Sequence, residues 1–239
     1  KGKNPFKDKR VREALSLAVD REAIKKSIMR GLSVPAGIIV APGVNGHSTD
    51  IDKAEFNVEK AKKLLTEAGY PNGFELTLDC PNNRYVNDEK VCQAVVAMWA
   101  KIGLKPKLNS MNFSPYIAKI QNHDTSLYLL GWGVATYDSL YSLQSLVRTK
   151  TTGADGNFNL GRISDTRLDA IIDQLKTEPD VTKRNALIRR ALERTKEEAY
   201  YVTLHHQIRP WAMKKEVTTL HRSDDRPEAR FAKVAGAGS

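Results

Sequence analysis

Several features that mark common protein classes are missing from this chain of 239 residues. No apolar run approaches the roughly 18 residues that a membrane-spanning helix needs, and no apolar secretion signal opens the chain. The first residues, Lys1-Gly2-Lys3, include no initiator methionine. We therefore expect a start that was processed or cut from a longer protein, with which a signal could have been lost. The hydrophobic content of 41% is enough for one large globular domain or two small ones.

The motifs of common enzyme and metal-site classes are also missing. Gly131-Trp132-Gly133 lacks the third glycine and the acidic partner of a dinucleotide site, and neither Gly-x-Ser-x-Gly nor His-Glu-x-x-His occurs. The only histidine pair, His205-His206, lies in a predicted strand, where neighbouring side chains face opposite sides and cannot ligate one metal together. We therefore predict no enzyme, no metal site and no cofactor, and we interpret the pair as packing at a strand end.

Basic residues outnumber acidic ones, 38 to 28, for a net charge of +10. Such an excess raises the question of a nucleic-acid or anionic-membrane partner. After residues 1–12, however, the cations alternate with acids along helical faces, as at 59–67, and no basic run is interleaved with aromatic residues. We therefore predict a solvated surface and no nucleic-acid partner. A nucleic-acid-binding domain would instead show strongly salt-dependent affinity for DNA.

Cysteine is scarce. Cys80 and Cys92 lie twelve positions apart, a spacing that matches no common zinc or redox motif. A disulfide and two free thiols both remain open at this point. A bridge that closes so short a loop would stabilise the fold by about 3 kcal/mol in the chain-entropy model.

Helical and strand patterns alternate along the chain, which predicts an α/β fold with a central mixed sheet flanked by helices. Strands are expected at 74–78 and 104–108, with a helix between them that completes a βαβ unit, and at 126–130, where an apolar run predicts a strand buried on both faces. The remaining elements are expected helices at 8–19, 21–30, 57–68, 87–102, 114–122, 140–147, 168–176 (capped by Ser164) and 182–198 (capped by Thr182), and a closing strand at 200–206.

The third predicted strand ends abruptly at Gly131-Trp132-Gly133. Glycines allow a sharp turn and a close approach of the backbone to a ligand, and ligands of open α/β sheets bind at the carboxyl ends of strands. Trp132, Gly133, Tyr137 and Asp138 are therefore candidate ligand contacts. Two plainer alternatives stay open: Trp132 could fill the end of a core, and Asp138 could only cap the next helix.

Two loops accompany this strand end. Asn83, Arg84 and Tyr85 follow the end of the first strand and could reach the same cleft, although a solvent-exposed loop held by the cysteines is an alternative. Residues 32–50 hold several glycines and prolines around an apolar patch at 38–40. Loops of this length are often functional or pack against a neighbouring domain.

Three segments resemble a known family. Asn4-Pro5-Phe6-Lys7-Asp8-Lys9-Arg10-Val11-Arg12-Glu13-Ala14-Leu15, together with residues 18–22, resembles the start of the second lobe in family 5 extracellular solute-binding proteins. These are the dipeptide, oligopeptide and nickel receptors of ABC importers. Residues 61–74 resemble the helix, turn and strand of the same family, and Gly131-Trp132 resembles its ligand-facing turn. The matches span residues 4 to about 215.

The resemblance implies the second lobe of a two-lobed, type II periplasmic-binding-protein-like fold. Residues 1–204 would form the ligand-binding lobe, and 205–239 a crossover strand and tail that return to a missing N-terminal lobe. The implied function is to capture a peptide or similar small solute between the lobes and to deliver it to membrane permease subunits, in the periplasm or outside the cell. In such an oxidising compartment we expect Cys80 and Cys92 to be bridged.

The sequence also departs from the family pattern. Peptide receptors of this family usually continue Gly-Trp-x-x-Asp, and that aspartate pairs with the α-ammonium of the peptide, but Ala135 stands here. A buried ammonium without a carboxylate is costly, so either Asp138 substitutes or the ligand is not an ordinary peptide. The alternative from another class is a small α/β hydrolase or transferase that uses Asp138 and His205 as acid and base.

Overall fold

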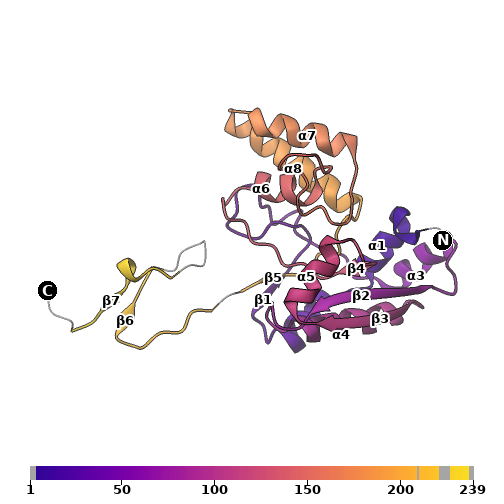
Figure 1. The fold of residues 1–239 in the computed structure, drawn as a ribbon, viewed down its shortest axis with the longest axis horizontal. Coiled ribbons are helices and arrows are strands. Elements are labelled where there is room, and N and C mark those ends of the chain that lie inside the picture. Colours follow the sequence, from indigo (N-terminus) through magenta and orange to yellow (C-terminus); the bar gives the residue numbers. More distant parts are fainter. Residues whose placement is uncertain (1–3, 209, 221–226, 237–239) are drawn as a thin grey trace.

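The computed structural model describes residues 4–208, 210–220 and 227–236 (Figure 1). Its α-helices are α1 (Lys9–Leu17), α2 (Arg21–Ala23), α3 (Val58–Glu67), α4 (Asp88–Ala100), α5 (Phe113–Gln121), α6 (Ser139–Ser142), α7 (Thr166–Thr177) and α8 (Val181–Glu197). The π-helical segments Ile24–Ile28 and Leu143–Val147 continue α2 and α6, and Pro5–Lys7 and Ala229–Phe231 form 3-10 helices. Its strands are β1 (Ser33–Pro35), β2 (Glu75–Pro81), β3 (Lys105–Met111), β4 (Leu127–Tyr128), β5 (His205–Gln207), β6 (Val217–Thr218) and β7 (Lys233–Val234). Within these ranges, no helix combines the length and the apolar character that crossing a bilayer requires.

The largest sheet has the strand order β3-β2-β4, and both of its pairings are parallel. Leu78 of β2 lies opposite Leu108 on one side and Leu127 on the other. The helix α4 connects β2 to β3, and α5 connects β3 to β4, so the predicted βαβ unit and the α/β class are confirmed. Antiparallel pairing occurs in separate two-stranded sheets, β1 with β5 and β6 with β7, rather than in one mixed sheet.

The third strand differs from its prediction. The segment 126–130 was expected to be buried on both faces, but β4 comprises only two residues, and both are half-buried. The reason is its position, because β4 pairs with β2 alone and forms an edge of the sheet. The closing strand is also shorter than the predicted 200–206, since β5 begins only at His205.

Capping side chains define several helix starts. The side chain of Asn57 accepts a hydrogen bond from a backbone N–H in the first turn of α3, as expected. The helices α7 and α8 are capped by Asp165 and Asp180, not by the predicted Ser164 and Thr182. A carboxylate at these positions both accepts the orphan N–H bonds and complements the positive end of the helix dipole.

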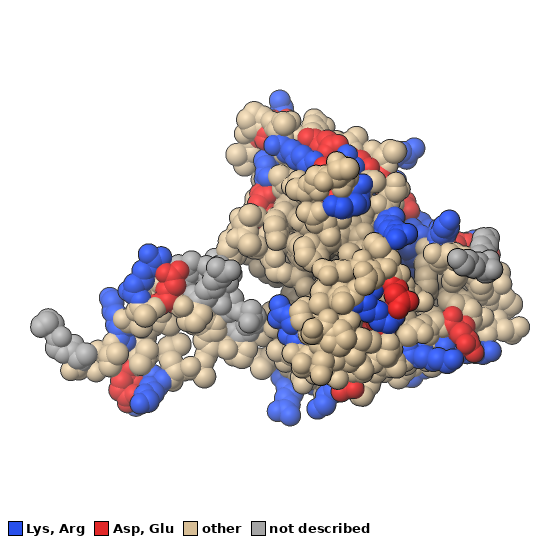
Figure 2. All heavy atoms as spheres, viewed as in Figure 1, with Lys and Arg blue, Asp and Glu red and all other residues tan. Residues whose placement is uncertain are grey.

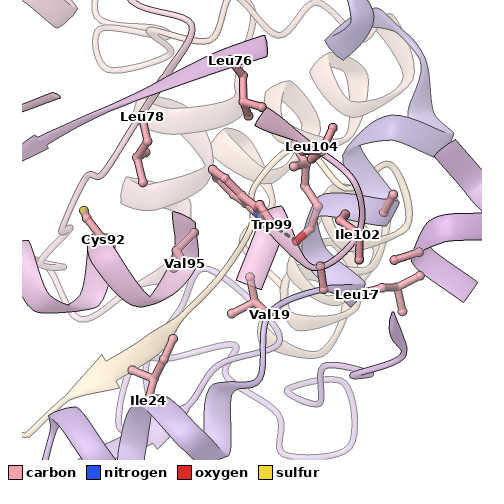
Figure 3. Close-up of a cluster of buried hydrophobic side chains, with 14 of the residues drawn as sticks. Leu17, Val19, Ile24, Leu76, Leu78, Cys92, Val95, Trp99, Ile102 and Leu104 are labelled. Carbon is pink, nitrogen blue, oxygen red and sulfur yellow. Dashed lines mark hydrogen bonds between the residues drawn. The ribbon is translucent and has the colours of Figure 1, made fainter. Parts of the chain in front are cut away.

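The buried apolar side chains of the described residues form two hydrophobic cores. The first packs α1, α3 and α4 against the parallel sheet, and in Figure 3 the indole of Trp99 lies at its centre. The Nε1–H of Trp99 donates a hydrogen bond to the Leu15 carbonyl, 3.0 Å away, so the buried indole leaves no polar atom unpaired. The second core is formed by α7, α8 and the turn that follows α6, and it includes Ile38 and Val40 of the long loop. The apolar patch of that loop is therefore packed.

The C-terminal segment has two parts. The strand β5 lies within the body of the molecule, because Val34 of β1 is opposite His206. The hairpin β6–β7 lies away from the body in Figure 1 and pairs Val217 with Val234. Leu220 and Val234 expose 58% and 52% of their surface. Residues 209, 221–226 and 237–239 of the expected tail lie outside the described residues.

Candidate functional site

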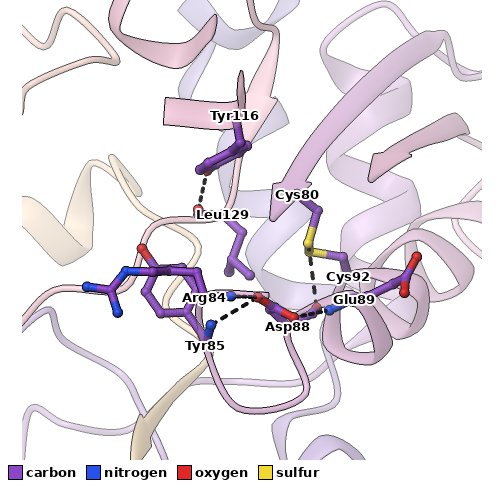
Figure 4. The surroundings of a disulfide bond; sticks show 8 residues. All are labelled: Cys80, Arg84, Tyr85, Asp88, Glu89, Cys92, Tyr116 and Leu129. Atoms are coloured by element: carbon purple, nitrogen blue, oxygen red, sulfur yellow. Dashed lines mark hydrogen bonds between the residues drawn. A yellow bond between two sulfur atoms is a disulfide. The ribbon is translucent and has the colours of Figure 1, made fainter. Parts of the chain in front are cut away.

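A buried carboxylate organises the loop that follows β2. Asp88 is only 4% exposed. Its Oδ2 accepts hydrogen bonds from the backbone N–H groups of Arg84 and Tyr85, both at 2.9 Å, and its Oδ1 accepts one from Glu89 at 3.0 Å (Figure 4). A charge removed from water is stable only when it is bonded in this way. Asp88 therefore determines where the side chain of Tyr85 lies.

A disulfide closes the same region. Cys80, near the end of β2, is bonded to Cys92 in α4, and both residues are fully buried (Figure 4). The expected bridge is thus confirmed. Together with Asp88, it holds the loop 81–87 from both of the elements that flank it.

The bridge yields a direct chemical prediction. We expect no reactive thiol when the unfolded, unreduced chain is treated with a thiol reagent, and two after reduction, because the chain has no other cysteine than Cys80 and Cys92. Two reactive thiols before reduction would contradict the bridge. A sample reduced and alkylated beforehand serves as the control.

The loop after β2 meets the loop after β4. A Cβ atom placed on Gly131 would lie 2.6 Å from Cε1 of Tyr85, closer than real contacts allow. The hydroxyl of Tyr85 also donates a long hydrogen bond, 3.5 Å, to the Gly131 carbonyl. Glycine is therefore needed at position 131 because an aromatic ring packs directly on the backbone. The loops that follow the carboxyl ends of two parallel strands, β2 and β4, are thus in contact here.

The other two candidates of the first loop lie at its exposed side. The side-chain carbonyl of Asn83 accepts a hydrogen bond from the Phe113 N–H, 2.8 Å away, at the start of α5. The guanidinium of Arg84 lies over the rings of Tyr85 and Phe113, at 5.4 and 5.2 Å from their centroids. Arg84 is exposed, so its charge is available to an anionic group of a ligand.

Trp132 is half-buried and packs on neighbouring aromatic rings. Its indole stacks on Tyr141 with 5.3 Å between ring centroids, and it meets the edge of Phe158 at 5.1 Å. Its Nε1–H donates to the Ser142 hydroxyl at 3.2 Å. Gly133 is exposed, and a Cβ atom there would meet no atom within 4 Å. Trp132 thus borders the second core while part of its surface stays accessible.

The carboxylate of Asp138 accepts hydrogen bonds from three residues. Its Oδ1 accepts a hydrogen bond from the Leu140 N–H and caps α6, so the expected capping role is confirmed. Arg184 binds both of its oxygens, at 2.6 and 2.8 Å, and Asn45 donates to Oδ2 at 2.9 Å. Burial acts to raise the pKa of Asp138, but these hydrogen bonds outweigh it, so the pKa lies below its ordinary value. Beside it, Tyr137 has left-handed backbone geometry, with φ 57°.

The alternative acid and base pair is not assembled. The carboxylate of Asp138 is bound to Arg184, whereas His205 lies on β5 beside Pro35 of β1. Among the described residues no hydrogen bond or ion pair joins Asp138 to His205. Burial lowers the pKa of His205, and its Nδ1 has no hydrogen-bond partner in the described part of the chain.

One cluster escaped the sequence analysis altogether. His47 of the long loop and Asp52, just after that loop, lie beside His206 of β5, and their side chains are close enough to share a metal ion. The loop pattern gave no sign of it, because His206 is 154 positions from Asp52. His205, by contrast, does not take part, which agrees with the expectation that adjacent strand residues point apart.

The surface charges are interspersed. On the face drawn in Figure 2, Lys and Arg side chains lie among Asp and Glu side chains. Many are paired: Arg148 bonds Asp169 and Asp173, both at 2.9 Å, and Lys176 bonds Asp155 at 2.8 Å. This pairing favours a solvated surface and gives no continuous basic patch on that face.

A separate hollow of about 490 Å³ lies between the two cores. Its lining includes Ile38, Ile39 and Lys196, and it contains none of the site residues expected from the sequence.

Comparisons with known proteins bear on this arrangement. The model of the family described as "Bacterial extracellular solute-binding proteins, family 5 Middle" matches residues 1–154. The heme-binding protein A of Haemophilus influenzae is 27% identical over 209 residues, which are 86% of this chain and 38% of that protein. The dipeptide-binding protein of Escherichia coli (strain K12) is 32% identical over 133 residues, 54% of this chain and 25% of that protein.

The solved structure of HbpA2 from Haemophilus parasuis has the same fold, with a TM-score of 0.83 at 24% identity. It matches over 97% of this chain and 46% of its own. The predicted class, one lobe of a type II periplasmic-binding-protein fold, is confirmed by this match. The chain spans less than half the length of the proteins that it resembles. Since the family model covers more than half of the chain, the chain belongs to the bacterial extracellular solute-binding proteins of family 5.

Proposed function

We propose that this chain is the ligand-binding lobe of the substrate-binding component of an ABC importer. It captures a peptide or similar small solute in a cleft between two lobes, in the periplasm or outside the cell, and delivers it to membrane permease subunits. The observation that carries the proposal is the contact of Tyr85 with Gly131, which unites two loops at the carboxyl edge of a parallel sheet. Family membership supports binding rather than catalysis.

The missing part of the receptor supplies the opposite wall in this proposal. Residues 1–204 form the ligand-binding lobe, and 205–239 contain the crossover strand and the tail that returns to the other lobe. The chain spans only 38% of the heme-binding protein A of Haemophilus influenzae, and this partial coverage supports the division. The exposed apolar side chains Leu220 and Val234 of the tail also favour a covering surface that the chain itself does not provide.

The ligand contacts in this proposal come from both loops. Asn83, Arg84 and Tyr85 contribute from the first loop, and Trp132, Gly133, Tyr137 and Asp138 from the second. These groups offer aromatic surface, a guanidinium and exposed peptide groups, a combination that suits an amphipathic solute with an anionic group.

The candidate site offers poor pairing for a free ammonium group on the ligand. Ala135 offers no carboxylate, and the carboxylate of Asp138 is already neutralised by Arg184. An ammonium would have to displace Arg184 or share Asp138 with it. We therefore expect solutes with a blocked or absent ammonium to bind better than ordinary peptides.

Substitution of Trp132 tests the site. Native mass spectrometry of the whole receptor, purified from its host, identifies the captured solute, and calorimetry then compares Trp132→Ala with the parent receptor. We expect Kd to rise at least about fivefold, because an indole whose accessible part contacts the solute at the centre of a site contributes more than about 1 kcal/mol.

The control is Tyr70→Ala, which removes an aromatic ring near the amino end of β2, at the opposite edge of the sheet. Its Kd should be unchanged. If Trp132→Ala keeps both its fold and its affinity, then Trp132 is core packing and does not line the site. If the receptor turns its solute over chemically, or captures none, the proposed transport function is wrong.

A further inference from the structure

Two histidines converge on one carboxylate oxygen away from the sheet edge. The Nε2 atoms of His47 and His206 lie 2.9 and 3.0 Å from Oδ2 of Asp52. The two rings are nearly perpendicular, at 79°, with 6.2 Å between their centroids. The side chains of His47, His206 and Asp52 are only 9%, 11% and 5% exposed, respectively. Three ligating atoms of the types that divalent transition metals prefer thus lie in one partly buried place.

The second oxygen of Asp52 is fixed by the backbone. Its Oδ1 accepts hydrogen bonds from the N–H groups of Gly37 and Ile38, at 2.5 and 3.1 Å. Bonds of this kind orient a metal-ligating carboxylate and keep its other oxygen free to bind. A side chain at position 37 would collide with Lys53, because its Cβ atom would lie 2.3 Å from the backbone nitrogen. The backbone therefore approaches Asp52 closely only with glycine there.

The Asp52 carboxylate makes four hydrogen bonds, two with the backbone N–H groups of Gly37 and Ile38 and two with the Nε2 atoms of His47 and His206. An imidazole binds a metal ion through Nε2 when its ring hydrogen is on Nδ1, so each histidine can offer a lone pair toward the same place as Oδ2.

The spacing fits a tetrahedral ion. Metal bonds of about 2.0–2.1 Å keep neighbouring ligand atoms about 3.3 Å apart. The three atoms lie within 4.8 Å of one another, and the two distances to Asp52 are 2.9 and 3.0 Å. An ion thus requires each distance to the oxygen to lengthen by a few tenths of an ångström, and it requires the two histidine nitrogens, which lie at most 4.8 Å apart, to approach the same distance of about 3.3 Å. The fourth position would hold water.

We propose that His47, Asp52 and His206 form a binding site for a divalent transition-metal ion of the zinc class. The ion would join the long loop to β5, the strand from which the chain continues to its tail. Lys196, whose ammonium donates to the Ile51 carbonyl at 2.7 Å, places a positive charge near Asp52 and opposes the ion. With three ligands and this charge, we expect a Kd on the order of 1 µM, weaker than for structural sites with four ligands.

Metal titration of the chain tests the site without any solute. After removal of metals with a chelator, ZnCl2 is added in competition with a chromogenic chelator. We expect one ion per chain, and at least about tenfold weaker binding in His47→Gln and in His206→Gln, because each loses one ligand of three. Glutamine keeps an N–H that can donate to Asp52, which preserves the hydrogen bonds of the metal-free fold.

The control variant is His123→Gln. This exposed histidine lies outside the cluster and should leave the Kd unchanged. Binding of CoCl2 gives a second readout that needs no variant, since a tetrahedral site produces strong visible absorption bands whereas hydrated Co2+ does not. The proposal is overturned if the chain binds no Zn2+ at 100-fold above the expected Kd, if Co2+ gives no tetrahedral spectrum, or if folded His47→Gln and His206→Gln bind as tightly as the parent. None of these outcomes bears on solute capture, which is measured separately.

Discussion

Replacing Asp88 by alanine is expected to destabilise the chain by about 3 kcal/mol. The buried carboxylate accepts three partly buried backbone hydrogen bonds, from Arg84, Tyr85 and Glu89. Alanine would leave these donors without an acceptor, and each buried unpaired donor costs about 1–3 kcal/mol, with incomplete additivity. Urea unfolding followed by circular dichroism measures the loss.

The same substitution should weaken solute binding, because the ring of Tyr85 would no longer be held against Gly131. Glu89→Gln is the matched control. It also removes an acidic charge from the first turn of α4, but this side chain makes no contact with the loop's N–H groups, so we expect a change of only a few tenths of a kcal/mol. Asp88→Asn keeps one side-chain carbonyl and should fall between the two. Equal stability of Asp88→Ala and Glu89→Gln would refute the role given to the buried carboxylate.

The isolated chain is expected to bind its solute at least about 100-fold more weakly than the whole receptor. In the proposed arrangement the solute is held from both sides, so one lobe retains only about half of the contacts. The residues proposed to contact the solute lie on loops of this one lobe, so without the opposite wall much of a bound solute would stay in water. Calorimetry with the same solute on both proteins gives the ratio.

Two controls make the comparison clear. Circular dichroism and the absence of free thiols show whether the isolated chain is folded with its Cys80 and Cys92 bridge intact. Trp132→Ala in the isolated chain should remove most of the residual binding. If the isolated chain and the whole receptor have equal affinity, the site lies wholly within this lobe, and the two-lobed arrangement proposed here is wrong.

Local chemistry made much of the fold predictable. Asn57 caps a helix because its side chain reaches an N–H three residues along, an interaction that depends on nothing distant. The βαβ unit follows from the alternation at 74–78, where β2 forms, and from the helical spacing of α4. The bridge between Cys80 and Cys92 was inferred from the compartment implied by the family resemblance, and the two residues lie on neighbouring elements.

Pairing between distant segments decided the rest. An apolar run cannot tell whether its strand lies inside a sheet or at its edge, and β4 lies at the edge because only β2 pairs with it. Likewise, the sequence marked Asp138 as a candidate anchor, but only the fold brings Arg184 to its two oxygens from 46 positions away.

By itself, then, the sequence determined the class of the fold, the family and the stretches from which the candidate site is built, since these depend on patterns of neighbouring residues. The tertiary structure alone decided what each candidate side chain touches. Gly131 is required by the ring of Tyr85, and His206 meets Asp52 and His47 across the chain. Such contacts arise when loop closure brings remote segments together, and the free energy that selects them comes from burial and pairing in the whole fold.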